Sequence, residues 1–317
     1  METGVKVYRG LSSIDDAMRG AVLAVGNFDG VHLGHQRILR TAHALAQVSS
    51  ATVAVMTFEP HPMAVLRPEH APARLTPWEE KLRQLERAGA GAVVRLEADH
   101  ATLSLSAEDF VRDILVKRIH PSYIVEGPNF GFGRGRAGNV TLLGEMSTKG
   151  GFQLRVVEPY RLMLSDGEHT VISSTVVRAC LRAGRVEDTA ACLGRPYSLV
   201  GVVVHGEGAG KHLGFPTINL NVGMQLVPGH GVYAGLVEVA GHRKAAAISI
   251  GHRPTLGGRT QVIEAFVLED SGDWYEMQAR LDIVRRLRDQ VKFSSREALS
   301  EQIARDVEAV REIVLID

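Results

Sequence analysis

Short apolar runs alternate with segments of helical periodicity over about the first 160 residues. Buried strands are predicted by the apolar runs at 21–25, 51–58, 92–96, 123–125 and 152–157. After the first run, apolar residues recur at helical spacing over 38–46, and residues 78–88 predict a second helix that Gly89 ends. A capping-type start at 106–109 opens another helix. This alternation favours an α/β domain, with a mostly parallel sheet covered by helices.

The pattern changes in the last third of the chain. Two short helical segments, one at 176–183 and one that ends before 194–196, lead into it. Strand-like segments then follow, separated by glycine, proline and short polar turns, at 198–205, 231–239, 244–250, 261–268 and 274–283. Only 295–313 has helical periodicity again. The sequence therefore predicts a small antiparallel β-barrel with a C-terminal helix, and two domains, 1–185 and 186–317.

Composition narrows the class of protein. The length of 317 residues suits about two domains, and 45% hydrophobic with 23% charged residues is typical of globular chains. The 36 basic and 36 acidic residues balance, so neither nucleic acid nor an acidic membrane is expected as a partner. Cys180 and Cys192 lack metal-ligand spacing and are expected to be buried free thiols. With no signal-peptide core and no membrane-length apolar run, a cytoplasmic protein is predicted.

The stretch 26–35, GNFDGVHLGH, joins the first predicted strand to the first predicted helix. A helix N-terminus offers unpaired N–H groups to phosphate, and glycines let the backbone approach the anion. His32 and His35 lie three residues apart across Gly34, so both rings can reach one phosphate. A single histidine is more often structural, but this setting favours nucleotide chemistry. This strand-to-helix stretch has neither the G-x-G-x-x-G pattern of dinucleotide dehydrogenases nor a Walker A pattern, which argues against a dinucleotide dehydrogenase.

Three further clusters follow predicted strands or begin a helix. Residues 58–62, FEPHP, end a strand, at the edge where α/β sheets bind ligands. Residues 127–133, GPNFGFG, also follow a strand, and their glycines and aromatic rings suit a planar ligand. Hydroxyls at 173–175 and the guanidinium of Arg178 suit phosphate. Ordinary helix capping is the alternative for these hydroxyls.

These motifs, with others in the second half, resemble the prokaryotic bifunctional riboflavin kinase/FAD synthetase family. In the first half the resemblance rests on 26–35, 58–62, 129–133 and 173–178. In the second half it rests on 201–206 (GVVVHG), Gly210, 214–220 (GFPTINL), 231–234 (GVYA), 250–255 (IGHRPT) and 287–293 (LRDQVKF). The resemblance covers nearly the whole chain in order. It implies a Rossmann-like nucleotidyltransferase domain followed by a riboflavin kinase-like barrel.

For the first domain the resemblance implies adenylyl transfer from ATP to FMN, giving FAD. Attack on the α-phosphorus builds charge on non-bridging oxygens, so positioning and electrostatic stabilisation dominate catalysis. His32 and His35 are the expected catalytic residues. Expected at the ATP phosphates are Gly26, Asn27, Phe28, Gly34, Ser174, Thr175 and Arg178. Expected at the flavin or nucleotide are Phe58, Pro60, His61 and Asn129. Mg²⁺, or a similar divalent cation, is expected to bridge the phosphates.

For the second domain the resemblance implies ATP-dependent phosphorylation of riboflavin to FMN. Glu264 matches the family's catalytic carboxylate, which accepts the proton of the ribityl hydroxyl. From the sequence alone, a solvent-facing strand residue is the alternative for Glu264. Thr217 and Asn219 lie two apart on an extended segment, so their oxygens share a face and can take the metal. ATP or flavin is expected to contact Gly206, Gly210, Lys211, Gly214, Pro216 and Arg288.

Several positions depart from the family pattern. Phe266 stands where histidine is usual, Glu276 where glycine is usual, Ser249 for a common asparagine and Gln290 for a common glutamate. In the first domain Gly131 replaces a larger or basic residue. Two other interpretations therefore stay open: a barrel that only binds or senses flavin, and a transferase acting on another phosphate ester. The expected partners are ATP, riboflavin and FMN, and homo-oligomerisation is left open.

Overall fold

A computed structural model describes residues 4–206, 215–255, 258–269 and 272–314. Its contacts divide the chain into two compact units. The first unit holds residues 1–72, 78–162 and 169–172. The second holds residues 73–77, 163–168 and 173–317. The segment from 173 to 185 thus packs with the barrel, whereas the predicted domain boundary at 186 stays a prediction about where an independently folding part begins.

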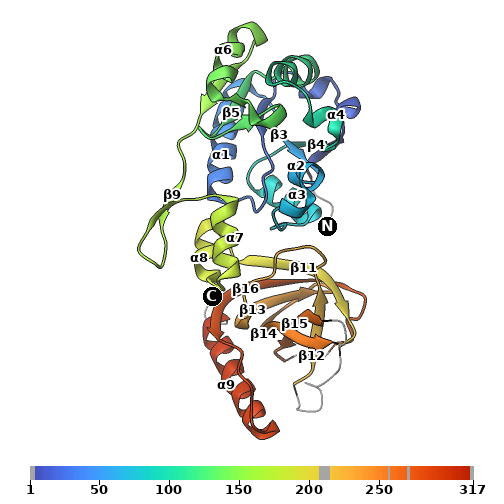
Figure 1. The fold of residues 1–317 in the computed structure, drawn as a ribbon, viewed down its shortest axis with the longest axis vertical. Helices are drawn as coiled ribbons and strands as arrows, with labels where there is room; N and C mark the ends of the chain where they lie inside the picture. The colour runs from blue at the N-terminus through green and yellow to red at the C-terminus, as the bar shows by residue number, and fades with distance from the viewer. Residues whose placement is uncertain (1–3, 207–214, 256–257, 270–271, 315–317) are drawn as a thin grey trace. The chain divides into compact units, whose positions relative to one another are not determined.

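The first unit is built on one parallel sheet (Figure 1). The strands lie in the order β1 (Lys6–Arg9), β4 (Ala92–Leu96), β3 (Val53–Phe58), β2 (Val22–Val25), β5 (Tyr123–Glu126) and β8 (Gln153–Val156). Every neighbouring pair is parallel, which confirms the predicted fold class. The edge strand β1 was not predicted, because its four residues are mostly polar and only partly buried.

Helices cover both faces of this sheet. Successive strand residues alternate between two apolar cores, as with Val22 and Leu23 of β2, and this explains why the strands appear as continuous apolar runs. One core includes Leu39 of α1 (Leu33–Ser49) and Leu85 of α3 (Trp78–Arg87). The other core includes residues of the π-helix η4 (Phe110–Ile119), which continues α5 (Ala107–Asp109), and of α6 (Val140–Gly150).

Shorter elements complete the first unit and link it to the next. They are η1 (Leu11–Ser13), η2 (Asp16–Met18), α2 (Pro62–Leu66), η3 (Pro68–His70), α4 (His100–Leu103), β6 (Gly131–Phe132), η5 (Arg134–Arg136), β7 (Gly138–Asn139), β9 (Arg161–Met163) and β10 (His169–Val171). The prolines expected to end β3 also begin α2, since Pro62 is its first residue.

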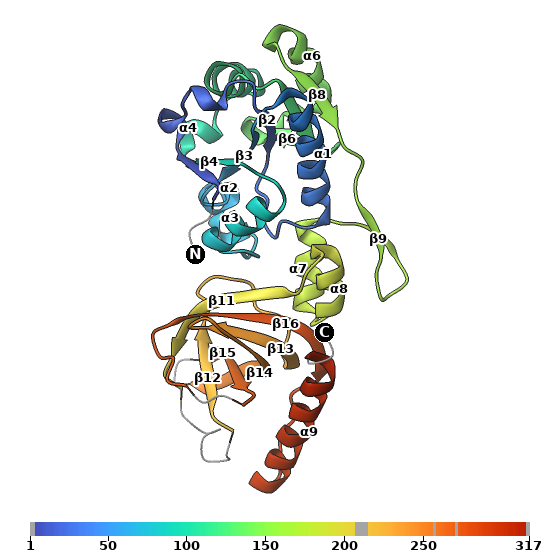
Figure 2. The ribbon, with the colours of Figure 1, turned by 180° about the vertical axis from the view of Figure 1, so that it is seen from behind.

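The second unit is a closed antiparallel barrel that follows two short helices, α7 (Ser174–Arg182) and α8 (Val186–Leu193). Around the barrel the order is β11 (Tyr197–Val204), β12 (Thr217–Asn221), β15 (Gly258–Val267), β14 (His242–Thr255), β13 (Gly231–Val239) and β16 (Gln278–Arg288). The helix α9 (Arg296–Val314) runs beside the barrel (Figure 2) and packs Val307 and Val310 against Ala245 and Ala247. The predicted barrel and terminal helix are confirmed. The last strand begins later than the predicted 274, because Trp274 is buried in the turn before it.

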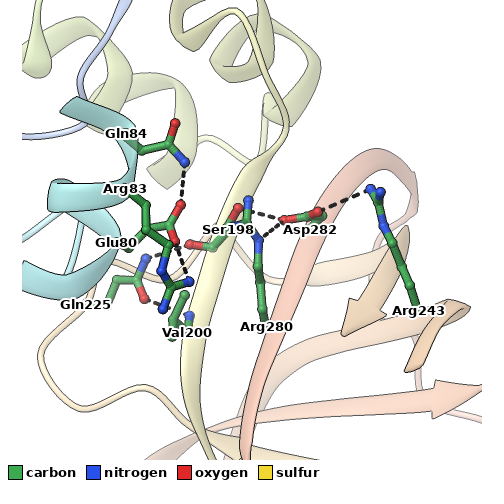
Figure 3. Close-up of polar contacts among 9 residues, drawn as sticks. All are labelled: Glu80, Arg83, Gln84, Ser198, Val200, Gln225, Arg243, Arg280 and Asp282. Carbon is green, nitrogen blue, oxygen red and sulfur yellow. Dashed lines mark hydrogen bonds and ion pairs between the residues drawn. The ribbon is translucent and has the colours of Figure 1, made fainter. Parts of the chain in front are cut away.

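Polar side chains join β11 and β16 where the barrel closes (Figure 3). Ser198 of β11 pairs with Asp282 of β16, and its hydroxyl donates to the Asp282 carboxylate at 2.6 Å, beside Arg280 Nε at 2.7 Å. On the side of β11 away from β16, before its pairing with β12 begins at Val202, the Gln225 amide accepts from Val200 N and donates to the Ser198 carbonyl. The Gln225 side chain thus satisfies backbone groups as a short strand would.

Candidate active site

The histidine turn, residues 26–35, leaves the carboxyl end of β2 and enters α1. The Gly26 amide still donates to the Met56 carbonyl of β3, at 3.0 Å. Beyond it the backbone reverses through positive φ angles at Phe28 (46°), Gly30 (86°) and Val31 (40°). Phe28 and Val31 are almost fully buried, so their packing outweighs the cost of a left-handed conformation. The turn is therefore held in a defined shape.

The two histidines of the turn stack on each other. His32 is the N-cap of α1, and its Nδ1 accepts from the His35 amide at 3.3 Å. The ring centroids lie 3.6 Å apart, with 20° between the ring planes. A Cβ added at Gly34 would lie 3.0 Å from His32 Cε1, so glycine is required for this close packing. The structure thus brings both predicted catalytic histidines to one helix N-terminus.

The environment of these rings is largely buried and lies close to a cation, Lys81. His32 is 6% exposed, and Nδ1 of His35 is buried with no hydrogen-bond partner among the described residues. Burial first, and then His32 and Lys81, hold the pKa of His35 well below its usual 6.5. Lys81 lies 3.6 Å from Glu59, and both side chains are largely buried. The sequence prediction missed this pair because Lys81 lies on α3, outside every motif.

The FEPHP segment lies against the histidine turn, as predicted for neighbouring strand ends. The Thr57 hydroxyl donates to the Asn27 carbonyl at 3.1 Å, and the Asn27 amide lies 3.0 Å from His61 Nε2. His61 Nδ1 accepts from the Met63 amide, which caps α2. The ring of Phe58 packs against the core, and Pro60 is exposed. The His61 side chain thus contacts Asn27 of the histidine turn, whereas the Phe58 side chain packs into the apolar core of the sheet.

The GPNFGFG loop gives a different result. Asn129 is exposed, and its carbonyl accepts from Arg136 Nη2 at 3.2 Å. The Arg136 guanidinium lies 2.9 Å from where a Cβ of Gly131 would stand. A basic group therefore occupies the position of the larger or basic side chain that the family usually has at Gly131. The hydrogen bond described for Asn129 thus goes to Arg136 and not to the histidine turn, and its role at the ligand stays a prediction.

The remaining first-domain phosphate residues lie on α7, in the second unit. Ser173 caps this helix, accepting from the Val176 amide at 3.3 Å, as the capping alternative expected. Arg178 is buried, and its Nε donates to the Ala73 carbonyl at 2.7 Å. The roles of Ser174, Thr175 and Arg178 at ATP stay predictions.

In the barrel, the register of three strands builds the Glu264 face, consisting of Thr217, Asn219, Ser249 and Glu264. Asn219 of β12 pairs with Glu264 of β15, which pairs on its other side with Ser249 of β14. Thr217 lies two residues before Asn219, so it shares their face. Glu264 is half-buried. The structure thus brings the predicted base beside the two predicted metal ligands.

The Glu264 face also explains some of the predicted glycine and metal positions. A Cβ at Gly206 would lie 2.1 Å from Asn219 Nδ2, so any other residue there would displace the Asn219 side chain. Thr217, Asn219 and Glu264 present oxygen atoms, the ligands that Mg²⁺ prefers. The described residues contain no group of three or more His, Cys, Asp or Glu that could hold a metal. Gly210, Lys211 and Gly214 lie outside the described residues, and Pro216 is exposed before β12.

Arg288 has a structural partner that the sequence did not reveal. Its Nε donates to Asp306 Oδ1 at 2.9 Å and its Nη2 to Oδ2 at 2.6 Å, while its guanidinium lies over the Phe293 ring. Asp306 belongs to α9 and is buried, so this two-bond ion pair ties α9 to the barrel. A contact between Arg288 and ATP or flavin stays a prediction.

The structure shows the contacts or the backbone conformation of several residues that depart from the family pattern. Phe266 packs edge-on against Phe215, with ring centroids 5.2 Å apart. Gln290 Nε2 donates to Ser249 Oγ at 3.0 Å, so two departures contact each other. Glu276 has a φ of 64°, in the left-handed region that favours glycine. Cys180 and Cys192 are free and buried, as expected.

Comparison with known proteins finds matches to two family models and to relatives that align over nearly the whole chain. Family models for FAD synthetase and riboflavin kinase match residues 14–176 and 193–314. The bifunctional riboflavin kinase/FMN adenylyltransferase of Escherichia coli K12 is 35% identical over 97% of each chain. That of Haemophilus influenzae is 33% identical, over 97% of this chain and 98% of its own.

A solved structure, described as a macrolide-efflux protein from Streptococcus pneumoniae, has the same fold. It superposes with a TM-score of 0.87 at 28% identity, covering 97% of this chain and 99% of its own. Among the described residues of the present chain, no helix has the length and apolar character needed to cross a membrane.

These matches favour two enzymatic activities over a barrel that only binds or senses flavin. Neither family model covers residues 177–192, so the predicted boundary at 186 is not tested by them. The chain belongs to the bifunctional riboflavin kinase/FMN adenylyltransferase family, with the FAD synthetase domain in its N-terminal part and the riboflavin kinase domain in its C-terminal part.

Proposed function

We propose that the histidine turn is the phosphate site of the adenylyltransferase, and that the stacked pair His32 and His35 stabilises the transition state. A phosphate oxygen of FMN attacks the α-phosphorus of ATP, a new P–O bond forms, and pyrophosphate leaves. The observation that carries this proposal is the 3.6 Å stack of two imidazoles at a helix N-terminus. Fixed donors at that position meet the charge that develops on the non-bridging oxygens.

In this proposal His35 acts as a neutral imidazole. Its pKa is held well below 6.5 by burial, so it stabilises charge near neutral pH by a hydrogen bond rather than as a cation. The nearby Lys81, paired with Glu59, adds positive charge close to the turn. Gly26, Asn27, Phe28 and Gly34 shape the backbone around the phosphates.

The same proposal gives the flavin or nucleotide to the segment beside the turn. His61 lies 3.0 Å from the Asn27 amide, which supports a contact between FEPHP and the bound substrate. Phe58, Pro60 and Asn129 are further candidate contacts on the same sheet edge. Ser174, Thr175 and Arg178 are assigned to the phosphates of ATP by the family resemblance.

For the kinase we propose that Glu264 is the general base. It accepts the proton of the ribityl hydroxyl while that oxygen attacks the γ-phosphorus of ATP, and ADP leaves. Thr217 and Asn219 would hold Mg²⁺ through their oxygens, which fit this cation. When bound, Mg²⁺ supplies neutralisation of phosphate charge. Gly206, Gly210, Lys211, Gly214, Pro216 and Arg288 are the proposed contacts to ATP or flavin.

The proposal also covers the cellular compartment, the partners and the domain bounds. Two buried free thiols suit a reducing compartment, and we place the enzyme in the cytoplasm. Its proposed partners are its small substrates and Mg²⁺, without nucleic acid. The predicted domains are 1–185 for adenylyl transfer and 186–317 for phosphorylation.

A direct assay tests the proposed function. The full chain is incubated with riboflavin, ATP and Mg²⁺, and riboflavin, FMN and FAD are separated by chromatography over time. FMN is expected to rise first and FAD to follow, with ADP and pyrophosphate as the by-products. Chelation of the metal should stop both steps. Riboflavin that binds but yields no FMN would restore the sensor interpretation.

A further inference from the structure

Glu126 is the last residue of β5, which pairs with β2 in the middle of the parallel sheet. The strands β3, β4 and β1 lie on one side of β2, and β5 and β8 lie on the other. The chain therefore changes winding direction between β2 and β5. In open α/β sheets, ligands bind outside the carboxyl ends of the strands at such a switch point. The Glu126 side chain is only 3% exposed there.

The hydrogen bonds of β2 explain what this carboxyl does. The amides of Val22 and Gly26 donate toward β3, to Thr52 and Met56. Because amides alternate along a strand, the Val25 N–H faces β5. The β2–β5 register, however, extends only to Leu23 and Ile124. Glu126 Oε1 supplies the missing acceptor, at 2.5 Å from the Val25 nitrogen.

Among the described residues, the Glu126 carboxyl has no charged partner. Within the part of the chain that the structure describes, its one hydrogen bond is that from Val25. Burial raises the pKa of Glu126 well above its ordinary range, because the low-dielectric interior disfavours the charged carboxylate. A neutral side chain with an amide oxygen at the same reach would thus serve equally well as the acceptor.

The location of this bond connects it to the histidine turn. On the β3 side the turn is anchored at Gly26 by Met56 and at Asn27 by Thr57. On the β5 side, the bond from Val25 to Glu126 is made at the residue immediately before the turn. We propose that Glu126 is a positioning residue for adenylyl transfer, whose carboxyl ties β5 to the end of β2 and fixes how the turn leaves the sheet.

This inference rests on the proposed role of the histidine turn, and three variants of the full chain test it. Glu126→Gln keeps the reach and an acceptor oxygen. Glu126→Asp keeps the carboxyl but is one methylene shorter, and Glu126→Leu keeps the size without an acceptor. Conversion of supplied FMN to FAD gives kcat and KM, and riboflavin phosphorylation by the same molecules is the internal control. Glu145→Leu, at an exposed position on α6, is the matched surface control.

We expect Glu126→Gln to retain kcat within about threefold, and Glu126→Leu and Glu126→Asp to lose about 10–100-fold, because small misplacements of catalytic groups are costly. The KM values for ATP and FMN should change less than kcat, and kinase activity should stay unchanged. Equal losses in the Gln and Leu variants, an unchanged kcat in the Asp and Leu variants, or a rise in KM alone would each overturn the inference. Wild-type protein that makes no FAD from FMN would instead overturn the proposed function.

Should Glu126→Leu fail to fold, as judged by circular dichroism and by its kinase activity, Glu126→Asp and Glu126→Gln still decide the question. An Asp variant as active as the Gln variant would then overturn the inference. A Gln variant near wild type beside an impaired, folded Asp variant would support it.

Discussion

The histidine turn consists of consecutive residues, whereas the Glu264 face brings together residues of three strands far apart in the sequence. In the turn, capping of α1, ring stacking and the missing Cβ of Gly34 all act within residues 26–35. In the barrel, Asn219, Glu264 and Ser249 meet only because the register of β12, β15 and β14 aligns them. Local geometry preorganises the first site, and global strand pairing preorganises the second.

The comparison also concerns burial. His32 and Nδ1 of His35 are buried, and burial shifts the pKa of His35. Glu264 is half-buried on the outer surface of the barrel, since its strand neighbours Ile263 and Ala265 are the buried ones. The histidine turn therefore has its electrostatic environment set by burial, whereas Glu264 lies on a more accessible face. Independent sites predict that each activity can be removed separately.

The largest effect is expected from Glu264→Gln. The ribityl hydroxyl is a poor nucleophile without a base, and a general base contributes about 10²–10⁴ in rate. FMN formation should fall by about that factor, while flavin binding, measured by fluorescence quenching, should persist. Conversion of supplied FMN to FAD should continue as in the wild type. A kinase rate that the substitution leaves unaltered would remove Glu264 from the mechanism.

The next largest effect is expected from His32→Ala and His35→Ala. Loss of one preorganised donor costs about 10²–10³ in rate, so FAD formation should fall by that factor in each variant. Riboflavin phosphorylation should remain nearly intact, because these rings belong to the first unit. If a folded variant lost both activities equally, the assignment of the two sites to two units would be wrong.

Parts of both candidate sites could be predicted from the sequence alone. The histidine turn was predicted because its chemistry and its strand–turn–helix setting occupy neighbouring residues, whereas the stacking of the two rings was not predicted. Thr217 and Asn219 were predicted to share a face from their spacing of two. Their proximity to Glu264 came only from the family resemblance, because strand register is not encoded in any local pattern.

The contacts that were not predicted join residues far apart in the sequence, and each includes at least one residue outside the motifs. Lys81 on α3 reaches Glu59, Asp306 on α9 holds Arg288, and Glu126 reaches Val25. Each joins segments whose approach depends on tertiary packing rather than on propensity. The helix α6 was missed for a different reason: its Gly144 and Thr141 weaken the helical pattern, and Leu143 is its one fully buried side chain.

A smaller effect is expected in the pH dependence of stability. The pKa of His35 lies below 6.5 in the folded protein, so between these values the unfolded chain binds a proton that the folded protein does not. The free energy of unfolding should therefore decrease as the pH falls below 6.5, by at most about 1.4 kcal/mol per pH unit from this residue. Urea unfolding at several pH values between pH 5 and pH 8 measures how the free energy of unfolding changes with pH.

His35→Gln is the matched variant, because it has no titrating group at this position. Its stability should change less between pH 8 and pH 5 than that of the wild type. Parallel curves for the two proteins would show that His35 protonates as readily in the folded state as in the unfolded chain.

The barrel offers a comparable but weaker test at Ser249 and Gln290. Their hydrogen bond of 3.0 Å lies beside Glu264, and neither residue follows the family pattern. One such bond contributes about 0.5–1.5 kcal/mol, so Ser249→Ala or Gln290→Ala should lower the kinase rate about 2–10-fold. The double variant should lose no more than either single variant, because both remove one interaction. Additive losses would mean that the two residues act separately.

The smallest effect is expected at Glu276, where the barrel departs from the family's usual glycine. Its φ of 64° strains a residue with a Cβ, and its amide donates to the Val203 carbonyl at 2.9 Å, so the backbone is fixed. Glu276→Gly should relieve about 1 kcal/mol of strain. The greater freedom of glycine in the unfolded chain offsets part of this, leaving a gain of a few tenths to about 1 kcal/mol. Urea unfolding followed by the fluorescence of buried Trp274 measures it.

Met277→Gly is the control, because Met277 is exposed and has no positive φ. It should destabilise the barrel through unfolded-state entropy alone. Kinase activity of Glu276→Gly within about twofold of the wild type would make the departure one of stability, since a twofold change is only about 0.4 kcal/mol in barrier. A gain of tenfold or more would mean that Glu276 restrains the barrel's chemistry. The turn before β16, which carries Glu276, would then influence the kinase rate in addition to the register of the strands.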